Sequence, residues 1–134
     1  MKKVLFVCRG NLCRSQVAQS FYNQKYPEHP SFSAGTQVDF PGQVISEHPN
    51  VTNTIAVMQE KNIDISHNTA TQLTEKMVDD FDTIIVMAEA LTIPAYLKNS
   101  PKFEYWEVVD MYGLDLLQTR QLRDQIEKLV LERF

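Results

Sequence analysis

Short runs rich in apolar residues alternate along the chain with segments whose apolar residues recur at helical spacing. The apolar runs cover residues 3–7, 31–34, 83–87 and 103–109, and they predict four strands. The first run is continuously apolar, as expected for a parallel strand that is buried on both faces. We therefore predict an α/β fold for residues 1–134, a single-domain three-layer sandwich built on a four-stranded parallel sheet.

The intervening segments have the spacing of helices. Ser15 is expected to cap the first helix with its side chain. Thr92 is expected to cap a short helix that has Pro94 in its first turn. The last helix has the clearest pattern, because its apolar residues face one side and its charged residues the other. The apolar positions of that last helix are Leu122, Ile126, Leu129 and Val130.

The turn that follows the first strand carries the most specific chemistry. It reads Cys8-Arg9-Gly10-Asn11-Leu12-Cys13-Arg14-Ser15. Gly10 and Asn11 tolerate left-handed backbone angles, so successive N–H groups can turn inward and form an anion-binding nest. The start of the following helix adds its positive dipole end. We therefore predict a phosphate-binding loop after the first strand.

Two side chains give this loop a catalytic role. Arg14 can bind two phosphate oxygens bidentately. Cys8 lies at the floor of the nest, where the same N–H groups stabilise a thiolate. We predict that Cys8 is an activated nucleophile and Arg14 a phosphate clamp. The other phosphate-binding loop residues are Arg9, Gly10, Asn11, Leu12, Cys13 and Ser15.

Other interpretations fit these residues less well. A zinc site needs two ligands beyond Cys8 and Cys13, and the three histidines stand at no ligand spacing. A Walker A motif is excluded because no Gly-Lys-Ser/Thr follows. Taken alone, Cys13 also fits a small, semi-buried hydrophobic residue beneath the loop. We predict neither a metal ion nor a cofactor.

The composition and charge of the chain further limit the class of protein to which it can belong. With 43% hydrophobic and 22% charged residues, the chain is typical of a soluble globular domain. Its formal net charge of −4 argues against a nucleic-acid partner. Its apolar runs are too short to cross a membrane, and its start does not have the pattern of a signal peptide. Because the only two cysteines are close together, we expect no secreted disulfide framework. We expect a cytoplasmic protein and a monomer.

The segment from Val4 to Ser15 resembles the signature of the low-molecular-weight protein tyrosine phosphatases. The resemblance continues in Ser33-Ala34-Gly35-Thr36, in Ile63 to His67, in Phe81-Asp82 and in Trp106 to Asp110. It implies the same roles for Cys8 and Arg14. It also implies that hydrogen bonds from a set of polar side chains support the loop, and that Ser15 assists the leaving thiolate. The implied supporting residues are Asn11, Ser15, Ser33 and His67.

Cleavage of a phosphate ester also needs a proton for the departing oxygen. Asp110 ends the fourth predicted strand at the same edge of the sheet as Cys8, and the resemblance implies that it is the general acid. Asp115 is the alternative acid, because it lies in the same loop. The resemblance further implies that Tyr112 and Phe40 form walls of the substrate cleft.

Some positions depart from the pattern of the family. Met111 stands where a proline usually follows the acid, and Ala88 removes a carboxylate beside the cleft. Gln16 and Gln19 replace a common proline and a common glutamate. These differences concern rate and substrate preference more than the reaction itself.

The leading hypothesis is a metal-independent phosphomonoesterase that hydrolyses protein phosphotyrosine through a phosphocysteine intermediate. Its partner would be a tyrosine-phosphorylated protein. Alternatives are an arsenate reductase that uses an external thiol, a phosphoarginine phosphatase, and a phosphate-binding module without turnover. Similar proteins that prefer phosphoarginine carry Thr where Leu12 stands, which favours the tyrosine hypothesis. We also predict that peroxide inactivates the protein reversibly through a Cys8–Cys13 disulfide.

Overall fold

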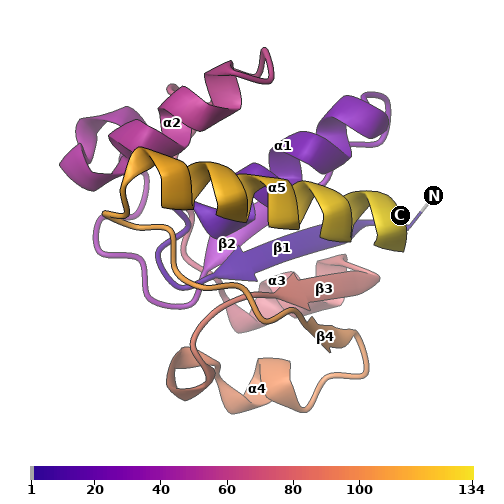
Figure 1. Ribbon diagram of the computed structural model, residues 1–134. Helices are drawn as coiled ribbons and strands as arrows, with labels where there is room; N and C mark the ends of the chain where they lie inside the picture. Colours follow the sequence, from indigo (N-terminus) through magenta and orange to yellow (C-terminus); the bar gives the residue numbers. More distant parts are fainter. Residues whose placement is uncertain (1) are drawn as a thin grey trace.

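The computed structural model describes residues 2–134, which form a parallel sheet between two layers of helices (Figure 1). The strands are β1 (Val4–Cys8), β2 (Phe32–Gly35), β3 (Thr83–Val86) and β4 (Phe103–Tyr105). Their order across the sheet is β2-β1-β3-β4, with every pair parallel. The order reverses between β1 and β3, so ligands are expected at the carboxyl edge of these two strands. The predicted α/β fold with four parallel strands is confirmed.

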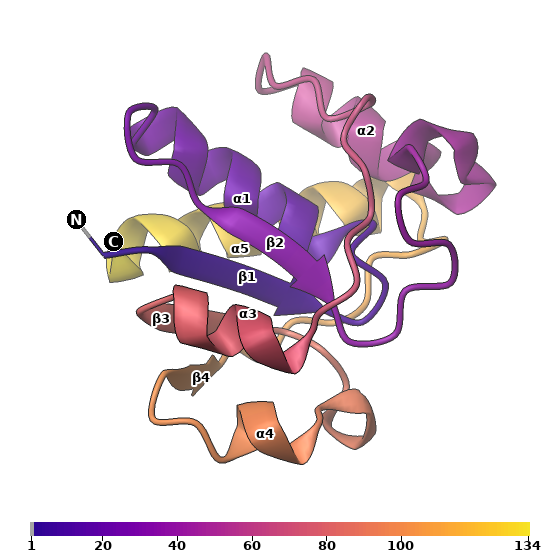
Figure 2. The same ribbon diagram turned by 180° about the vertical axis from the view of Figure 1, so that it is seen from behind.

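The helices divide between the two faces of the sheet (Figures 1 and 2). They are α1 (Arg14–Lys25), α2 (Thr52–Gln59), α3 (Glu75–Asp80), α4 (Ala95–Lys98) and α5 (Leu116–Arg133). Helices α1, α2 and α5 cover one face, and α3 and α4 cover the other. Side chains of β1 therefore alternate between two apolar cores: Val4 and Phe6 lie in the first, and Leu5 and Val7 in the second.

The ends of several elements differ from the sequence prediction. The fourth strand ends at Tyr105 instead of residue 109, although Trp106 N–H still donates to Val86 O at 2.9 Å. It is an edge strand, so its continuation has no neighbour on the outer side. Helix α1 begins at Arg14 and has no side-chain cap, so the capping role predicted for Ser15 is wrong. The predicted cap Thr92 ends a separate 3₁₀ turn, and α4 begins after Pro94.

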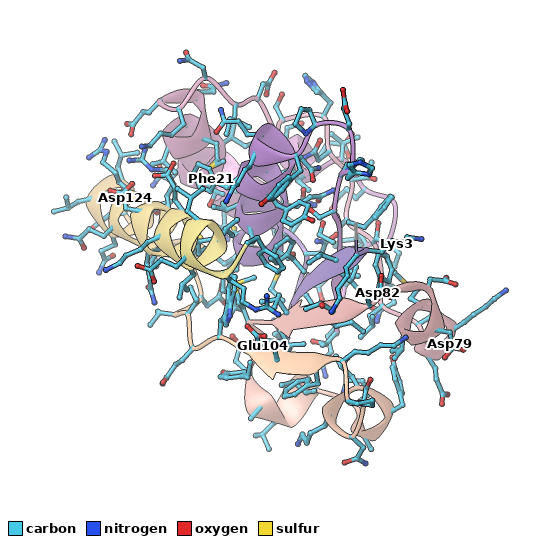
Figure 3. All side chains as sticks on the ribbon, turned by 90° about the vertical axis from the view of Figure 1, so that its right-hand side faces the viewer. Lys3, Phe21, Asp79, Asp82, Glu104 and Asp124 are labelled. Carbon is cyan, nitrogen blue, oxygen red and sulfur yellow. The ribbon has the colours of Figure 1, made fainter. Side chains whose placement is uncertain are left out.

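The amino-terminal edge of the sheet is closed by charged and backbone groups. Lys3 N–H donates to Asp82 Oδ2 at 2.7 Å, and Asp82 N–H donates to Lys3 O at 2.8 Å. Figure 3 shows the two side chains beside each other at this edge. The opposite, carboxyl edge is therefore the one that is left for a ligand.

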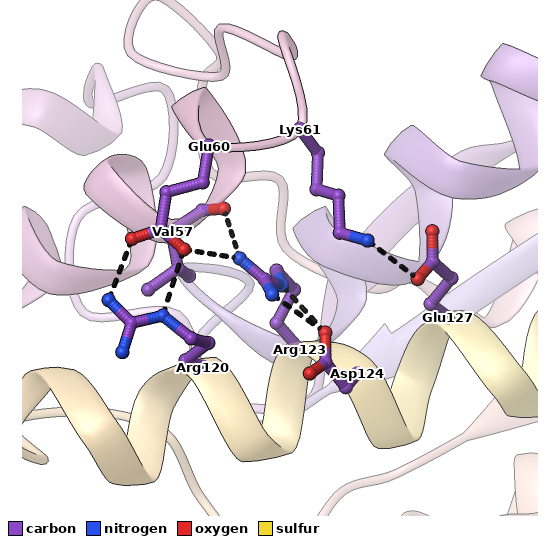
Figure 4. A network of polar contacts seen from close by, with 7 residues as sticks. All are labelled: Val57, Glu60, Lys61, Arg120, Arg123, Asp124 and Glu127. Carbon is purple, nitrogen blue, oxygen red and sulfur yellow. Dashed lines mark hydrogen bonds and ion pairs between the residues drawn. The ribbon is translucent and has the colours of Figure 1, made fainter.

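A polar network joins α2 to α5 (Figure 4). Glu60 follows α2 and accepts from Arg120 Nε at 3.0 Å and Nη2 at 2.8 Å. The nearly buried Arg123 donates through Nη1 to Glu60 Oε1 at 2.6 Å and to Val57 O at 2.9 Å. The two guanidinium groups lower the pKa of Glu60 from 4.5 to about 2.

This lowered pKa predicts an acid-sensitive contribution of Glu60 to stability. The unfolded chain binds a proton at Glu60 more tightly than the folded protein does. The stabilisation is therefore present above pH 4.5 and is lost as the pH falls towards about 2. We expect Glu60→Gln to lower the free energy of unfolding near pH 6 and to flatten its fall between pH 4.5 and 2.

Urea unfolding at a series of pH values measures this effect. Glu132→Gln is the matched control, because Glu132 lies 3.9 Å from Lys128 on the exposed surface of α5. The control should keep the native pH profile. Parallel profiles for native protein and Glu60→Gln would contradict the assignment.

Candidate active site

A pocket opens at the carboxyl edge of the sheet, above the loop between β1 and α1. The lining residues are Cys8, Arg9, Gly10, Leu12, Cys13, Arg14, Asp39, Asp110 and Tyr112. Most of them belong to the predicted phosphate loop, and Asp110 and Tyr112 come from the distant segment before α5. The fold thus brings together the predicted nucleophile, the predicted clamp and the predicted acid.

The backbone of the loop is shaped by two special positions. Asn11 has a φ of 54°, in the left-handed region, as the sequence suggested. Gly35 at the end of β2 passes so close that a Cβ there would lie 2.6 Å from Arg9 O and 2.9 Å from Asn11 N. Residues after Gly35 then hydrogen-bond to the loop: Thr36 N–H donates to Cys8 O, and Gln37 N–H donates to Arg9 O, both at 2.9 Å.

Asn11 links the loop to its surroundings through its side-chain amide. Its Nδ2 donates to Ser15 Oγ at 2.7 Å and to Ser33 Oγ at 3.0 Å, and its Oδ1 accepts from Thr71 N–H at 2.8 Å. Because Ser15 Oγ accepts from Asn11, its own hydrogen is free to point at Cys8 Sγ, which lies 3.0 Å away. This hydrogen bond stabilises a negative charge on the sulfur.

Arg14 is buried beneath the pocket, with 3% of its side chain exposed. Its Nη1 donates to Met87 O at 2.5 Å and contacts Glu89 Oε1 at 2.7 Å. Its Nε has no partner among residues 2–134, although it is fully buried. A buried donor without a partner is costly, and an oxyanion in the pocket would satisfy it. Burial opposes the charge of Arg14, but Cys8, Glu89 and Asp110 outweigh this and raise its pKa.

Asp110 stands at the mouth of the pocket with about half of its side chain exposed. Its Oδ1 lies 3.9 Å from Arg14 Nη2 and accepts from Tyr112 N–H at 3.0 Å. A carboxyl group in this place can reach the leaving oxygen of a phosphate held by the loop.

Cys13 lies under the loop and is buried. Thr54 Oγ1 donates to its sulfur at 3.3 Å, but burial dominates and raises the pKa of Cys13 to about 12. Both Cys8 and Cys13 are free thiols in this structure. Cys13 is thus more deeply buried than the sequence suggested, and it is a thiol near neutral pH.

Three of the predicted site residues lie elsewhere. His67 is exposed and pairs with Asp64 at 3.2 Å, so it does not support the loop. The peptide N–H of Thr71, and not the imidazole of His67, donates to Asn11 Oδ1. The aromatic ring of Phe40 is 62% exposed and does not line the pocket. Asp115 accepts from Gln118 N–H at 2.8 Å as the cap of α5, so it is not an alternative acid.

Two carboxylates were missed by the sequence reasoning. Glu89 contacts the guanidinium of Arg14, so a carboxylate beside the cleft is kept one residue after Ala88. Asp39 lines the pocket in place of its neighbour Phe40. The signal for Glu89 was its place at the carboxyl end of β3, the neighbour of β1. No sequence signal singled out Asp39, because its loop has no regular structure.

The side chains of Gln16 and Gln19 support the loop through hydrogen bonds. Gln16 Nε2 donates to Asn11 O at 3.0 Å, and Gln19 Oε1 accepts from Ser33 Oγ at 2.6 Å. Ser33 therefore accepts from Asn11 and donates to Gln19, which fixes its hydroxyl group. The predicted supporting roles of Asn11, Ser15 and Ser33 all correspond to contacts in the structure.

No group of three or more His, Cys, Asp or Glu side chains within residues 2–134 could hold a metal ion. In the same part of the chain, every helix is too short or too polar to span a membrane.

Comparisons with known proteins show the family of the chain. Residues 3–132 match the family described as low molecular weight phosphotyrosine protein phosphatase. A glutaredoxin arsenate reductase of Synechocystis is 34% identical over 133 residues, or 97% of this chain and 94% of the relative. The chain belongs to this family, and it is a cysteine-based enzyme of the phosphatase or the arsenate reductase kind.

Solved structures of both kinds are similar. The tyrosine phosphatase AmsI of Erwinia amylovora has a TM-score of 0.82 at 25% identity, with 98% of this chain and 91% of that chain covered. An arsenate reductase in a phosphate-binding state has a TM-score of 0.77 at 31% identity, with 98% and 95% covered. The family and its fold are therefore established, whereas similarity alone does not separate the two activities.

Proposed function

We propose that this protein hydrolyses phosphotyrosine in proteins through a phosphocysteine intermediate. The observation that carries the proposal is one pocket that contains three functional groups. Cys8 lies at its floor, the Nε of Arg14 has no hydrogen-bond partner within residues 2–134, and the carboxyl group of Asp110 lies at its mouth. Arg14 binds the phosphoryl group, Cys8 attacks it, and Asp110 donates a proton to the leaving group.

The first chemical step follows from this arrangement. Cys8 Sγ attacks phosphorus, the bond between phosphorus and the tyrosine oxygen breaks, and Asp110 gives its proton to that oxygen. Arg14 and the loop N–H groups hold the three remaining phosphoryl oxygens as charge develops. The sulfur–phosphorus bond stores the phosphoryl group.

In the second step, Asp110 accepts a proton from water, and the water oxygen attacks phosphorus. The sulfur–phosphorus bond breaks, and Cys8 leaves as a thiolate that receives the hydrogen bond of Ser15. Phosphate is released and Asp110 is protonated again, so the catalyst returns to its starting state.

The walls of the pocket favour an aromatic leaving group. Leu12 and Tyr112 both line it, and they present apolar surface to a substrate ring. Leu12 offers no hydrogen bond to a guanidinium group, which is the reason that phosphoarginine is the less suitable substrate. We also propose a cytoplasmic location and a monomer as the active form.

Arsenate reduction is a second candidate, because the relative named above as an arsenate reductase is 34% identical. After Cys8 attacks arsenate and displaces water, a second thiol must attack the Cys8 sulfur. A disulfide then forms, the sulfur–arsenic bond breaks, and arsenic leaves as arsenite with the two electrons of that bond. Cys13 is the only other cysteine of the chain, and its pKa near 12 makes it a poor nucleophile at neutral pH. An external thiol is therefore required for this activity.

We expect Cys8→Ser to abolish turnover and to keep the binding of phosphate or vanadate, since Arg14 and the loop N–H groups provide the affinity. The native protein is assayed with p-nitrophenyl phosphate, with phosphotyrosine and phosphoarginine as competitors, and with arsenate plus a dithiol. Phosphotyrosine should compete best. Residual turnover within about tenfold of the native rate would contradict the role of Cys8. Faster turnover of arsenate would favour the second candidate, and binding without turnover would indicate a non-catalytic module.

We expect Asp110→Asn to slow substrates with poor leaving groups more than those with good ones. A general acid typically contributes about a hundred- to ten-thousand-fold, and its contribution grows with the basicity of the leaving oxygen. The measurement is kcat/KM for phenyl phosphate and for p-nitrophenyl phosphate, because this quantity covers the step in which the leaving group departs and not the later hydrolysis of the phosphocysteine. Asp115→Asn is the control. If both substrates slow equally in Asp110→Asn, the carboxyl group of Asp110 has only a structural role.

We expect peroxide to inactivate the protein reversibly through a Cys8–Cys13 disulfide. Peroxide oxidises the Cys8 thiolate to a sulfenic acid, and Cys13 then displaces water to form the disulfide. Because the pKa of Cys13 is raised to about 12, this closure should accelerate as the pH rises from 7 to 9.

The measurement is the fraction of starting activity that a dithiol restores, in the native protein and in Cys13→Ala, together with intact masses. Phosphate should protect both, because it covers the Cys8 sulfur. Recovery should be lost in Cys13→Ala after excess peroxide. Equal recovery, or the absence of a two-hydrogen mass loss in the native protein, would leave Cys13 as a buried apolar residue only.

A further inference from the structure

The segment that carries Asp110 is fastened to a second segment far away in the sequence. Tyr112 Oη lies 3.0 Å from His48 Nδ1, Gly113 N–H donates to Asn50 O at 3.3 Å, and Asn53 Nδ2 donates to Leu114 O at 2.9 Å. Three successive residues after Met111 are thus each tied to the stretch 48–53, which leads into α2. Figure 1 shows that the link from β4 reaches α5 beside the start of α2.

The contact between His48 and Tyr112 has two components. One is the hydrogen bond between the phenol and the imidazole, and the other is an edge-to-face contact of the rings, with centroids 5.1 Å apart and planes at 73°. Both side chains are partly exposed to water. The contact between His48 and Tyr112 therefore has a defined geometry, and a substitution can remove it without disturbing the apolar core.

Tyr112 affects the site in two ways. Its side chain lines the pocket, and its N–H holds Asp110 Oδ1 at 3.0 Å. Any shift of Tyr112 therefore moves a wall of the cleft and rotates the carboxyl group of the acid. On its other side, Met111 is buried with 1% exposure and anchors the backbone in the core.

A proline after the acid would restrict this backbone directly, and the chain has Met111 instead. Gly113 has a φ of 74°, so the turn depends on a residue with wide conformational freedom. Without a contact from another part of the chain, residues 110–113 would have no fixed orientation at Tyr112. The hydrogen bond of His48 supplies that contact from a separate part of the chain.

We propose that His48 is a positioning residue for the general acid: it holds Tyr112 in place, and Tyr112 directs Asp110 towards the leaving oxygen. This inference rests on the proposed phosphatase function and goes beyond it by adding a residue outside the pocket to the machinery of proton transfer. His48 itself does not touch the substrate.

The test uses His48→Phe, which keeps a ring beside Tyr112 and removes the hydrogen bond, and His48→Gln, which keeps a polar partner. We expect kcat/KM of His48→Phe for phenyl phosphate to fall by about tenfold, and for p-nitrophenyl phosphate by less than about threefold, since proton transfer matters most for a basic leaving group. His48→Gln should restore most of the loss. His29→Phe, at an exposed position outside the site, is the control.

The decisive variant combines His48→Phe with Asp110→Asn. If His48 acts through Asp110, the ratio of the rates for p-nitrophenyl phosphate and phenyl phosphate should be the same in the double variant as in Asp110→Asn alone. Tyr112→Phe should show the same loss as His48→Phe, and the two together should lose no more than either alone. Thermal midpoints and vanadate affinities of His48→Phe and His48→Gln should match the native protein, since these substitutions leave the phosphate loop, Arg14 and Asp110 unchanged.

The outcomes distinguish the positioning role of His48 from the proposed phosphatase function. Native turnover with an unchanged ratio of the two substrates in His48→Phe would overturn the role of His48 and leave the phosphatase function intact. Equal slowing of both substrates, or a full additional loss in the double variant, would also overturn it. Absence of phosphatase turnover in the native protein would overturn the proposed function and this inference together.

Discussion

The buried guanidinium of Arg14 is the constraint on which the site depends. A charge taken out of water is costly unless polar groups surround it, and here they come from several elements. The carbonyl of Met87 follows β3, the carbonyl of Val108 lies 3.2 Å away beyond β4, and the carboxylates of Glu89 and Asp110 complete the set. The ends of β3 and β4 are therefore held to the loop after β1, so the pocket is a junction of three strands and not a property of the loop alone.

The backbone of the loop depends on a second set of short contacts. Asn11 is left-handed and ties two hydroxyl groups with one amide, and each hydroxyl then has one hydrogen left for a defined acceptor. For Ser15 that acceptor is the Cys8 sulfur, and for Ser33 it is Gln19. The orientation of a single side chain thus decides where the proton of Ser15 points, and so how much of the charge on the nucleophile is stabilised.

The sequence could predict what depends on local chain geometry. A buried strand, a turn with Asn11 and a helix starting near Arg14 are consecutive, so spacing alone placed the nucleophile and the clamp. The positions of His67 and Phe40 depend on how two irregular segments settle against the sheet, and no periodic pattern encodes that. The prediction that Ser15 caps the helix was wrong because it considered the local sequence alone. The hydroxyl group of Ser15 forms hydrogen bonds with Cys8 and Asn11 instead of with the helix backbone.

The pocket has opposite polarity at its two ends. Its floor is cationic through Arg14, and its rim carries the carboxylates of Asp39 and Asp110. A phosphate dianion bound at the floor is attracted, but once it moves outward it passes the carboxylate of Asp39, a like charge that repels it towards the solvent. The same charge gradient that holds a phosphoryl group for attack therefore favours the escape of the inorganic product, and it keeps a second anion from following the first into the cleft.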